Sequence, residues 1–138
     1  MNLLDKTGEP RELDRDECLR LLAKGAIGRI VFTDAAMPAV QPVTYLLDGE
    51  EIIFHAWNGS KLATRRPVLA FQADEIDPHA RIGWSVVGVG QAYEVTNPDR
   101  LAGLAERQEA AWASAPMGHT IAIPLHHLTG HRLDREIS

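Results

Sequence analysis

The fold is decided by residues 39–61, AVQPVTYLLDGEEIIFHAWNGSK. Two strand-like runs flank Asp48-Gly49, a dipeptide that favours the tight turn of a β-hairpin. The second run leads into Gly59-Ser60-Lys61, a loop of small residues with a lysine. Backbone N–H groups at a helix start bind anions, and a nearby ammonium group adds positive charge. The stretch therefore predicts a hairpin followed by a phosphate cradle. A helix cap followed by a solvated lysine is the alternative.

Composition limits the classes of protein to which the chain can belong. Its 138 residues and 45% hydrophobic content predict one domain with its own core, in which residues 1–12 form an N-terminal tail. The net charge of −5 argues against a nucleic-acid binder, because such proteins carry a basic patch. No apolar run approaches about 20 residues, so no membrane span is expected. The first residues lack the pattern of a signal peptide, and with a single cysteine a cytoplasmic location is the default expectation.

Short strands dominate the rest of the chain. Asp14 is a good cap for a helix that ends near Lys24, and Asn97-Pro98 begins a second helix whose apolar face extends to Trp112. A third, short helix is expected from Ser60 to Arg66. Strands are expected over residues 28–34, 39–47, 51–55, 68–76, 81–96, 119–124 and 130–133. The pattern predicts a mainly β protein with peripheral helices, in which about six strands form a small antiparallel barrel.

The common catalytic and nucleotide-binding motifs are absent from this sequence. It has no Walker loop, no Gly-x-Gly-x-x-Gly turn between a strand and a helix, and no Gly-x-Ser-x-Gly elbow. His126, His127 and His131 are the nearest to a metal cluster, but adjacent residues of a strand face opposite ways, so no metal site is predicted. Cys18 falls on an apolar helix face and is interpreted as core. Missing acid, base and nucleophile signals fit a protein whose reaction belongs to a cofactor, and no catalytic residue is assigned.

Ordered motifs along the chain resemble one known family. They are Gly28-Arg29-Ile30-Val31-Phe32, Pro42-Val43-Thr44-Tyr45, Gly59-Ser60-Lys61-Leu62, Asp74-Glu75-Ile76-Asp77, Gly83-Trp84-Ser85-Val86-Val87 and Leu128-Thr129-Gly130-His131-Arg132-Leu133. Together they resemble the pyridoxamine 5′-phosphate oxidase-like flavoproteins, in particular the small actinobacterial and nitroimidazole-reductase-like branch. The resemblance runs from about Leu13 to Leu133.

The resemblance implies a split β-barrel that forms a homodimer and binds FMN in grooves at the subunit interface. It places Val43, Thr44 and Tyr45 beside the isoalloxazine ring. It places Gly59, Ser60 and Lys61 at the phosphate of FMN.

The tryptophans are assigned less directly. By resemblance Trp84 and Trp112 line the flavin ring or the interface. Taken singly, each is better explained by the residues alone as a core or interface side chain.

The resemblance further implies an FMN-dependent oxidoreductase that acts on a small organic substrate, with no nucleic-acid or membrane partner. Vitamin B6 oxidation itself is not expected, because the additional basic residues of the full oxidase have no match here. Two alternatives stay open. One is a reductase of the same fold that uses the deazaflavin F420, for which Lys61, Arg65 and Arg66 supply positive charge. The other is a non-catalytic module that binds or senses a flavin.

Overall fold

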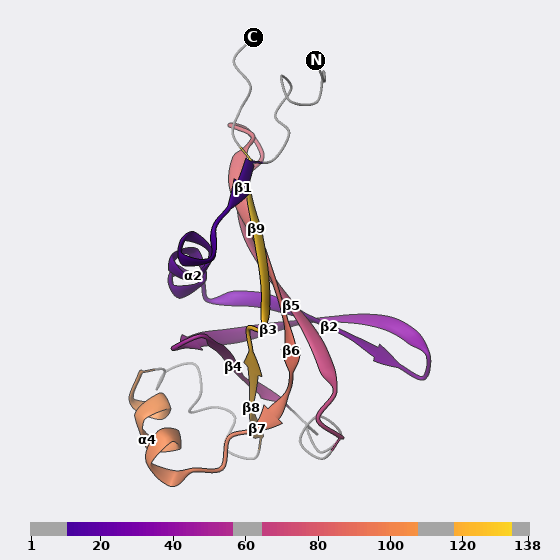
Figure 1. Ribbon diagram of the computed structural model, residues 1–138, viewed down its shortest axis with the longest axis vertical. Coiled ribbons are helices and arrows are strands. Elements are labelled where there is room, and N and C mark those ends of the chain that lie inside the picture. The colour runs from indigo at the N-terminus through magenta and orange to yellow at the C-terminus, as the bar shows by residue number, and fades with distance from the viewer. Residues whose placement is uncertain (1–10, 57–64, 108–117, 134–138) are drawn as a thin grey trace.

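The computed structural model describes residues 11–56, 65–107 and 118–133 (Figure 1). Within them, one antiparallel sheet has nine strands in the order β1-β9-β6-β5-β2-β3-β4-β8-β7. The strands are β1 (Arg11–Leu13), β2 (Ile27–Asp34), β3 (Met37–Asp48), β4 (Glu51–Ala56), β5 (Val68–Asp77), β6 (Ile82–Gln91), β7 (Tyr93–Glu94), β8 (His119–Pro124) and β9 (His127–Leu133). The helices are α2 (Arg15–Lys24) and α4 (Pro98–Arg107). This curled sheet with two helices is the split β-barrel that the sequence predicts.

The strand count is nine, so the expectation of about six was too low. The expected tail is one source of the difference, because Arg11 to Leu13 pair with β9 as an edge strand. A second source is the expected long strand over residues 81–96, which divides at Ala92. Its first part, β6, stays beside β5, whereas Tyr93 and Glu94 pair with β8 on the other half of the sheet.

Helix α2 begins where the sequence places it. The Asp14 side chain accepts a hydrogen bond from the N–H of Glu17, and the Glu17 side chain accepts one from the N–H of Asp14. This reciprocal capping box satisfies donors that the first helical turn leaves free. The helix buries Cys18, Leu21 and Leu22 against the inner face of the sheet, which confirms the assignment of Cys18 to the core.

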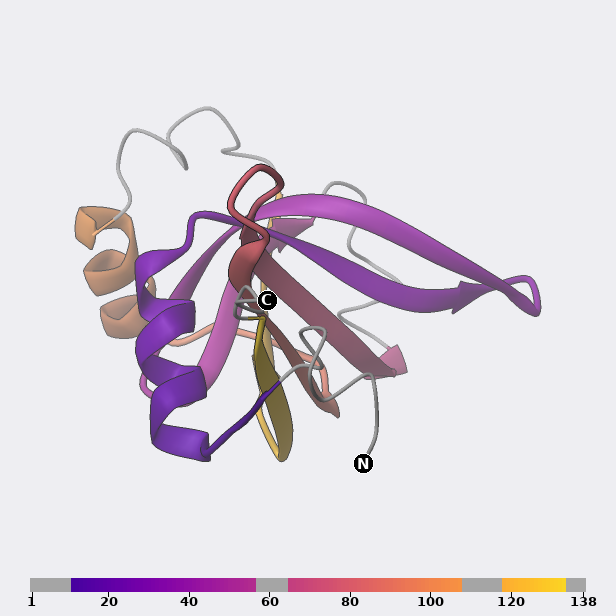
Figure 2. The same cartoon turned by 90° about the horizontal axis from the view of Figure 1, so that it is seen from above.

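Helix α4 covers the other half of the sheet (Figures 1 and 2). Asn97 accepts a hydrogen bond from the N–H of Arg100 at 3.0 Å, as expected of its cap residue. Leu104 is buried and Leu101 packs beside it, against a cluster that includes Ile53 and Ala122. Strands β4 and β8 are therefore covered on both faces. This explains their unbroken apolar runs, in which Ile52 and Phe54 belong to the main core and Ile53 to the α4 side.

The β2–β3 hairpin projects from the body of the molecule as an arm (Figure 2). Asp34 pairs with Met37, so the turn consists of Ala35 and Ala36 alone. Both alanines have positive φ, 51° and 65°, a conformation that glycine and asparagine adopt more easily. Met37 and Val40 lie on this arm and are 67% and 62% exposed.

Candidate functional site

The flavin-side strand predicted from the sequence is β3, and its side chains alternate between two environments. Val43 and Tyr45 point into the core and are 9% and 1% exposed. The Tyr45 hydroxyl donates to the Leu22 carbonyl at 2.7 Å, and its ring meets Phe71 edge to face. Thr44 is exposed and shares the opposite face of the sheet with its cross-strand partner Ile27. A ligand on that face therefore meets Thr44, whereas the side chains of Val43 and Tyr45 are not available to it.

Burial changes the chemistry of the Tyr45 hydroxyl. Desolvation raises the pKa of Tyr45 to about 12, because the apolar surroundings disfavour the phenolate. The group stays protonated and keeps its hydrogen bond to α2. Tyr45 is thus a structural link between β3 and the end of α2.

The outer face of the sheet, opposite the core, carries a polar cluster formed by Arg29, Gln72, Asp74 and Ser85. The Arg29 guanidinium donates to Gln72 at 3.0 Å and lies 3.5 Å from an Asp74 carboxylate oxygen. The Gln72 amide nitrogen donates to Asp74 at 2.8 Å and to the Ser85 hydroxyl at 3.2 Å. These groups come from β2, β5 and β6, so strand pairing alone brings them together.

Apolar side chains surround this cluster on the same outer face. Val40 pairs with Val31, Val31 with Ala70, and Ala70 with Val89, which forms a row across four strands. Val31 and Val40 are exposed, as are Ile27, Val68 and Val87 elsewhere on the face. A sheet face that presents several large aliphatic groups to solvent is typical of a binding surface. The outer face, with Thr44 and the polar cluster, is therefore the candidate site.

Sequence reasoning did not assign the four residues of the polar cluster to a site, although Arg29, Asp74 and Ser85 belong to the motifs that carry the resemblance. Arg29 did carry a signal, since it occupies an outward position between Ile27 and Val31 in an alternating strand. The grouping with Gln72 and Ser85 depends on strand order. That order was not available from the sequence pattern.

The other predicted site residues divide into two groups. Trp84 is 8% exposed and lies in the main core on the inner face, so its side chain is not on the candidate site. Gly59, Ser60, Lys61 and Trp112 lie outside the described residues, as does most of the expected helix over residues 60–66. Their proposed roles stay predictions.

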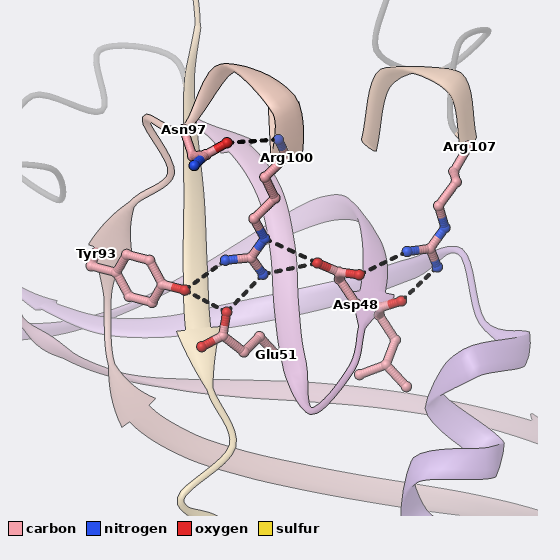
Figure 3. Close-up of polar contacts among 7 residues, drawn as sticks. Asp48, Glu51, Tyr93, Asn97, Arg100 and Arg107 are labelled. Carbon is pink, nitrogen blue, oxygen red and sulfur yellow. Dashed lines mark hydrogen bonds and ion pairs between the residues drawn. The ribbon is translucent and has the colours of Figure 1, made fainter. Parts of the chain in front are cut away.

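A second polar network joins α4 to the β3–β4 turn (Figure 3). Arg100 donates to Asp48 at 3.0 Å, to Glu51 at 2.8 Å and to the Tyr93 hydroxyl at 2.8 Å. Arg107 adds a bond to Asp48 at 3.0 Å. Burial is the main cause that raises the pKa of Tyr93, followed by its hydrogen bond to Glu51. Because these groups satisfy one another, the network is interpreted as the attachment of α4.

Neither a metal cluster nor a membrane-spanning helix is found in the described parts of the chain. No three His, Cys, Asp or Glu side chains gather there in an arrangement that suits a metal ion. None of the described helices is long and apolar enough to cross a membrane.

Comparison with known proteins agrees with the architecture. Residues 14–132 match the model of a family described as pyridoxamine 5′-phosphate oxidase. The chain belongs to this family. An uncharacterized protein of Mycobacterium tuberculosis is 40% identical over an alignment of 129 residues, and the match covers 88% of this chain and 84% of that protein. The resemblance to pyridoxamine 5′-phosphate oxidase-like proteins of actinobacteria is thereby confirmed.

Solved structures of similar fold match nearly the whole chain. The FAD binding protein from Mycobacterium smegmatis is 30% identical with a TM-score of 0.72, covering 89% of this chain and 97% of that one. An FAD-binding protein from Mesorhizobium loti has a TM-score of 0.71 at 23% identity, covering 91% and 99%, and supports the fold alone.

Proposed function

We propose that this chain is a flavin-dependent oxidoreductase that acts on a small organic substrate. The observation that carries the proposal is its membership of the pyridoxamine 5′-phosphate oxidase family over residues 14–132. The 30% identical mycobacterial structure, described as an FAD binding protein, supports a flavin as the cofactor.

The outer face of the sheet has the chemistry that a flavin requires. The isoalloxazine ring is a flat, largely apolar body with hydrogen-bonding atoms along one edge. Val31 and Val40 supply apolar surface on β2 and β3, and Thr44 supplies a hydroxyl near the base of the hairpin. Arg29 supplies N–H groups for a polar edge, since its interactions with Gln72 and Asp74 use one of its terminal nitrogens. The residues present fit the group.

The roles within the reaction divide between the cofactor and the chain. A bound flavin supplies hydride or electron transfer through its own ring. The strands supply a rigid platform, because β2 pairs with β3 along its whole length from Ile27 to Asp34. Their aliphatic side chains would exclude water from a bound ring. Arg29 and Thr44 would hold its polar atoms.

We also propose that the outer face is completed by a second copy of the chain. Ile27, Val40 and Val68 are each more than 60% exposed, and burying such side chains is worth about 1.5–3 kcal/mol each. A homodimer would cover this surface and enclose the flavin between two sheets. Val40→Glu is expected to weaken both dimerisation and flavin binding. Ala102→Glu, which adds the same charge on an exposed position of α4, is the matched control.

Which flavin the chain binds depends on the residues that contact the phosphate end of the cofactor. FMN is proposed, with Lys61 as the cation at its phosphate. Lys61→Ala then weakens FMN binding by roughly 10- to 100-fold, the equivalent of a charge-assisted hydrogen bond, without loss of the folded state. Riboflavin lacks the phosphate group, so its affinity for the two proteins serves as the internal control. Equal loss for riboflavin and FMN would contradict the assignment.

The direct experiment is to purify the protein and identify what it binds. The expected result is a yellow protein that releases FMN, or FAD as in the mycobacterial relative, on denaturation. Reduction of the bound flavin by NAD(P)H and its reoxidation by an organic acceptor would support an oxidoreductase. A flavin that binds tightly but never turns over would instead indicate a binding or sensing module. A colourless protein that takes up no added flavin would overturn the proposal.

F420 is the second candidate cofactor. Arg65 and Arg66 are both exposed just before β5, where they favour a more acidic ligand than FMN. Parallel titrations with F420 and FMN distinguish the two, since the proposed function requires the flavin to bind more tightly.

A further inference from the structure

A small hollow lies where three segments of the chain cross, at the seam between the two halves of the sheet. Its cavity volume is about 260 Å³. The segments are the residues before β5, the β6–β7 junction and the β8–β9 junction. The lining residues are Arg66, Gln91, Ala92, Tyr93, Pro124 and His126.

The walls of this hollow are held by bonds within the protein. The Ala92 N–H donates to the Pro67 carbonyl at 2.8 Å, and the Gln91 side-chain amide donates to the Arg66 carbonyl at 3.0 Å. At Gly90 the β6 backbone passes so close to the Pro124 carbonyl that a Cβ would lie 1.7 Å from its oxygen. The hollow is thus formed before any ligand binds, which lowers the entropic cost of binding.

Its lining is basic and hydrogen-bonding. Arg66 and His126 are exposed, and none of the described residues that line the hollow is acidic. Within residues 11–56, 65–107 and 118–133, the Arg66 guanidinium has no carboxylate partner, whereas Arg29, Arg100 and Arg107 all pair with acids. An arginine with a free planar fork at a preformed hollow suits a phosphate or carboxylate.

The backbone at Arg66 strengthens this interpretation. Its φ is +47°, in the left-handed region that a non-glycine residue rarely adopts. The next residue is Pro67, which further disfavours a helical conformation at the position before it. Asparagine or glycine fits this conformation better, so arginine is not the residue that backbone stability selects. Of the four non-glycine residues with positive φ in the described parts of the chain, Ala35, Ala36, Arg66 and Arg81, Arg66 is the one that lines this hollow.

We propose that this hollow binds the phosphate or carboxylate group of a small anionic ligand, with the Arg66 guanidinium as its main contact. The site goes beyond the proposed flavin face, because no residue of that face lines it. Its ligand is either the anionic end of the cofactor or a separate anionic substrate.

The test compares Arg66→Asn with Arg65→Asn, which removes the same charge from the neighbouring exposed position. The protein as purified is titrated with inorganic phosphate, and the backbone amide signals of Gln91, Tyr93 and His126 are followed by NMR. In the wild type and in Arg65→Asn these signals are expected to shift and saturate. In Arg66→Asn the affinity is expected to fall about 10- to 100-fold. The Tm is expected to stay level or rise, because asparagine suits the left-handed backbone.

The two possible sources of the anion are separated by FMN and riboflavin. If Arg66→Asn reduces the preference for FMN over riboflavin, the anion is the phosphate of the cofactor. If that preference is unchanged while phosphate binding is lost, the hollow takes a separate ligand.

Absence of phosphate-induced shifts at the lining residues, or equal affinity in both variants, would refute the site. Because phosphate itself is the probe, this outcome is independent of whether the protein binds a flavin.

Discussion

Replacement of Tyr45 by phenylalanine distinguishes a structural role for this residue from a ligand-binding one. The change removes only the hydroxyl, whose hydrogen bond to the Leu22 carbonyl is 2.7 Å long and buried. That carbonyl keeps a second donor, the N–H of Gly25 at 3.2 Å. The Leu22 carbonyl therefore keeps one hydrogen-bond partner in the variant. The expected loss of unfolding free energy is about 1–2 kcal/mol, below the limit of about 3 kcal/mol for a buried group left with no partner.

The expected loss is large against the total stability of a domain, about 5–15 kcal/mol. Urea unfolding followed by circular dichroism measures it, with an unchanged slope as the sign that the same surface is exposed. Flavin affinity is expected to be unchanged in Tyr45→Phe. Thr44→Val is the matched control on the same strand, where flavin affinity falls and stability is nearly unchanged.

The pH dependence gives an independent measurement of the burial of the same hydroxyl. The pKa of Tyr45 is raised from 10.0 to about 12 in the folded protein, so above pH 10 the unfolded chain loses its proton first. The stabilising contribution is complete below pH 10 and is lost as the pH rises towards 12. Its size is at most about 3 kcal/mol, at 1.36 kcal/mol per pKa unit. Tyr45→Phe lacks this pH-dependent contribution. The pKa of Tyr93 is also raised, but Tyr93 is present in both proteins, so its contribution drops out of the comparison.

One pattern of results would refute this reasoning. If Tyr45→Phe weakened flavin binding tenfold and left the urea midpoint unchanged, the hydroxyl would face a ligand and not the end of α2. An identical alkaline unfolding profile in the two proteins would likewise show that the hydroxyl is not buried.

Four further substitutions test the fold. Ala36→Gly is expected to raise the unfolding free energy by about 0.5–1 kcal/mol, because φ is 65° at this position. Gly49→Ala is expected to lower the unfolding free energy by about 1–2 kcal/mol, because φ is 62° there. Thermal melts measure both changes. Gly90→Ala is expected to cost about 3 kcal/mol or more, since its new methyl meets the Pro124 carbonyl; full stability in a urea melt would contradict this contact. Arg100→Met is expected to cost about 1–2 kcal/mol and to speed amide hydrogen exchange in α4 above all, whereas unchanged exchange there would show that the network does not attach the helix.

Much of the local structure follows from the sequence. The Asp14 cap, the Asn97 cap and the strand over residues 119–124 all lie where residue patterns place them. The hairpin signal at Asp48-Gly49 also holds, although Asp48 pairs with Glu51 and the turn itself is Gly49-Glu50. These features depend on residues within a few positions of one another, so their energetics are visible in the sequence.

The end of α2 near Lys24 is predicted correctly, but the reason for the glycine at position 25 is not the expected one. Gly25 directly follows the helix that the sequence predicts to end near Lys24, and a glycine in that place commonly adopts the left-handed conformation. In the structure its φ is −81°, which any residue adopts. A Cβ at this position would lie 2.2 Å from the Tyr45 hydroxyl oxygen, so close approach of the β3 side chain explains the glycine. That contact joins residues 20 positions apart and has no local signal.

By itself, the sequence determined that this protein is a split β-barrel of the pyridoxamine 5′-phosphate oxidase family, because alternation, turns, caps and ordered motifs are local properties. Tertiary structure decided which surface is offered to a ligand. In the folded sheet Val43 and Tyr45 face the core and Thr44 faces outward. Arg29 contacts Gln72, which lies 43 positions later in the sequence. Tertiary structure also closed the hollow at Arg66 from three separate segments. Strand order and pleat fix which side chains meet, and these are properties of the assembled sheet.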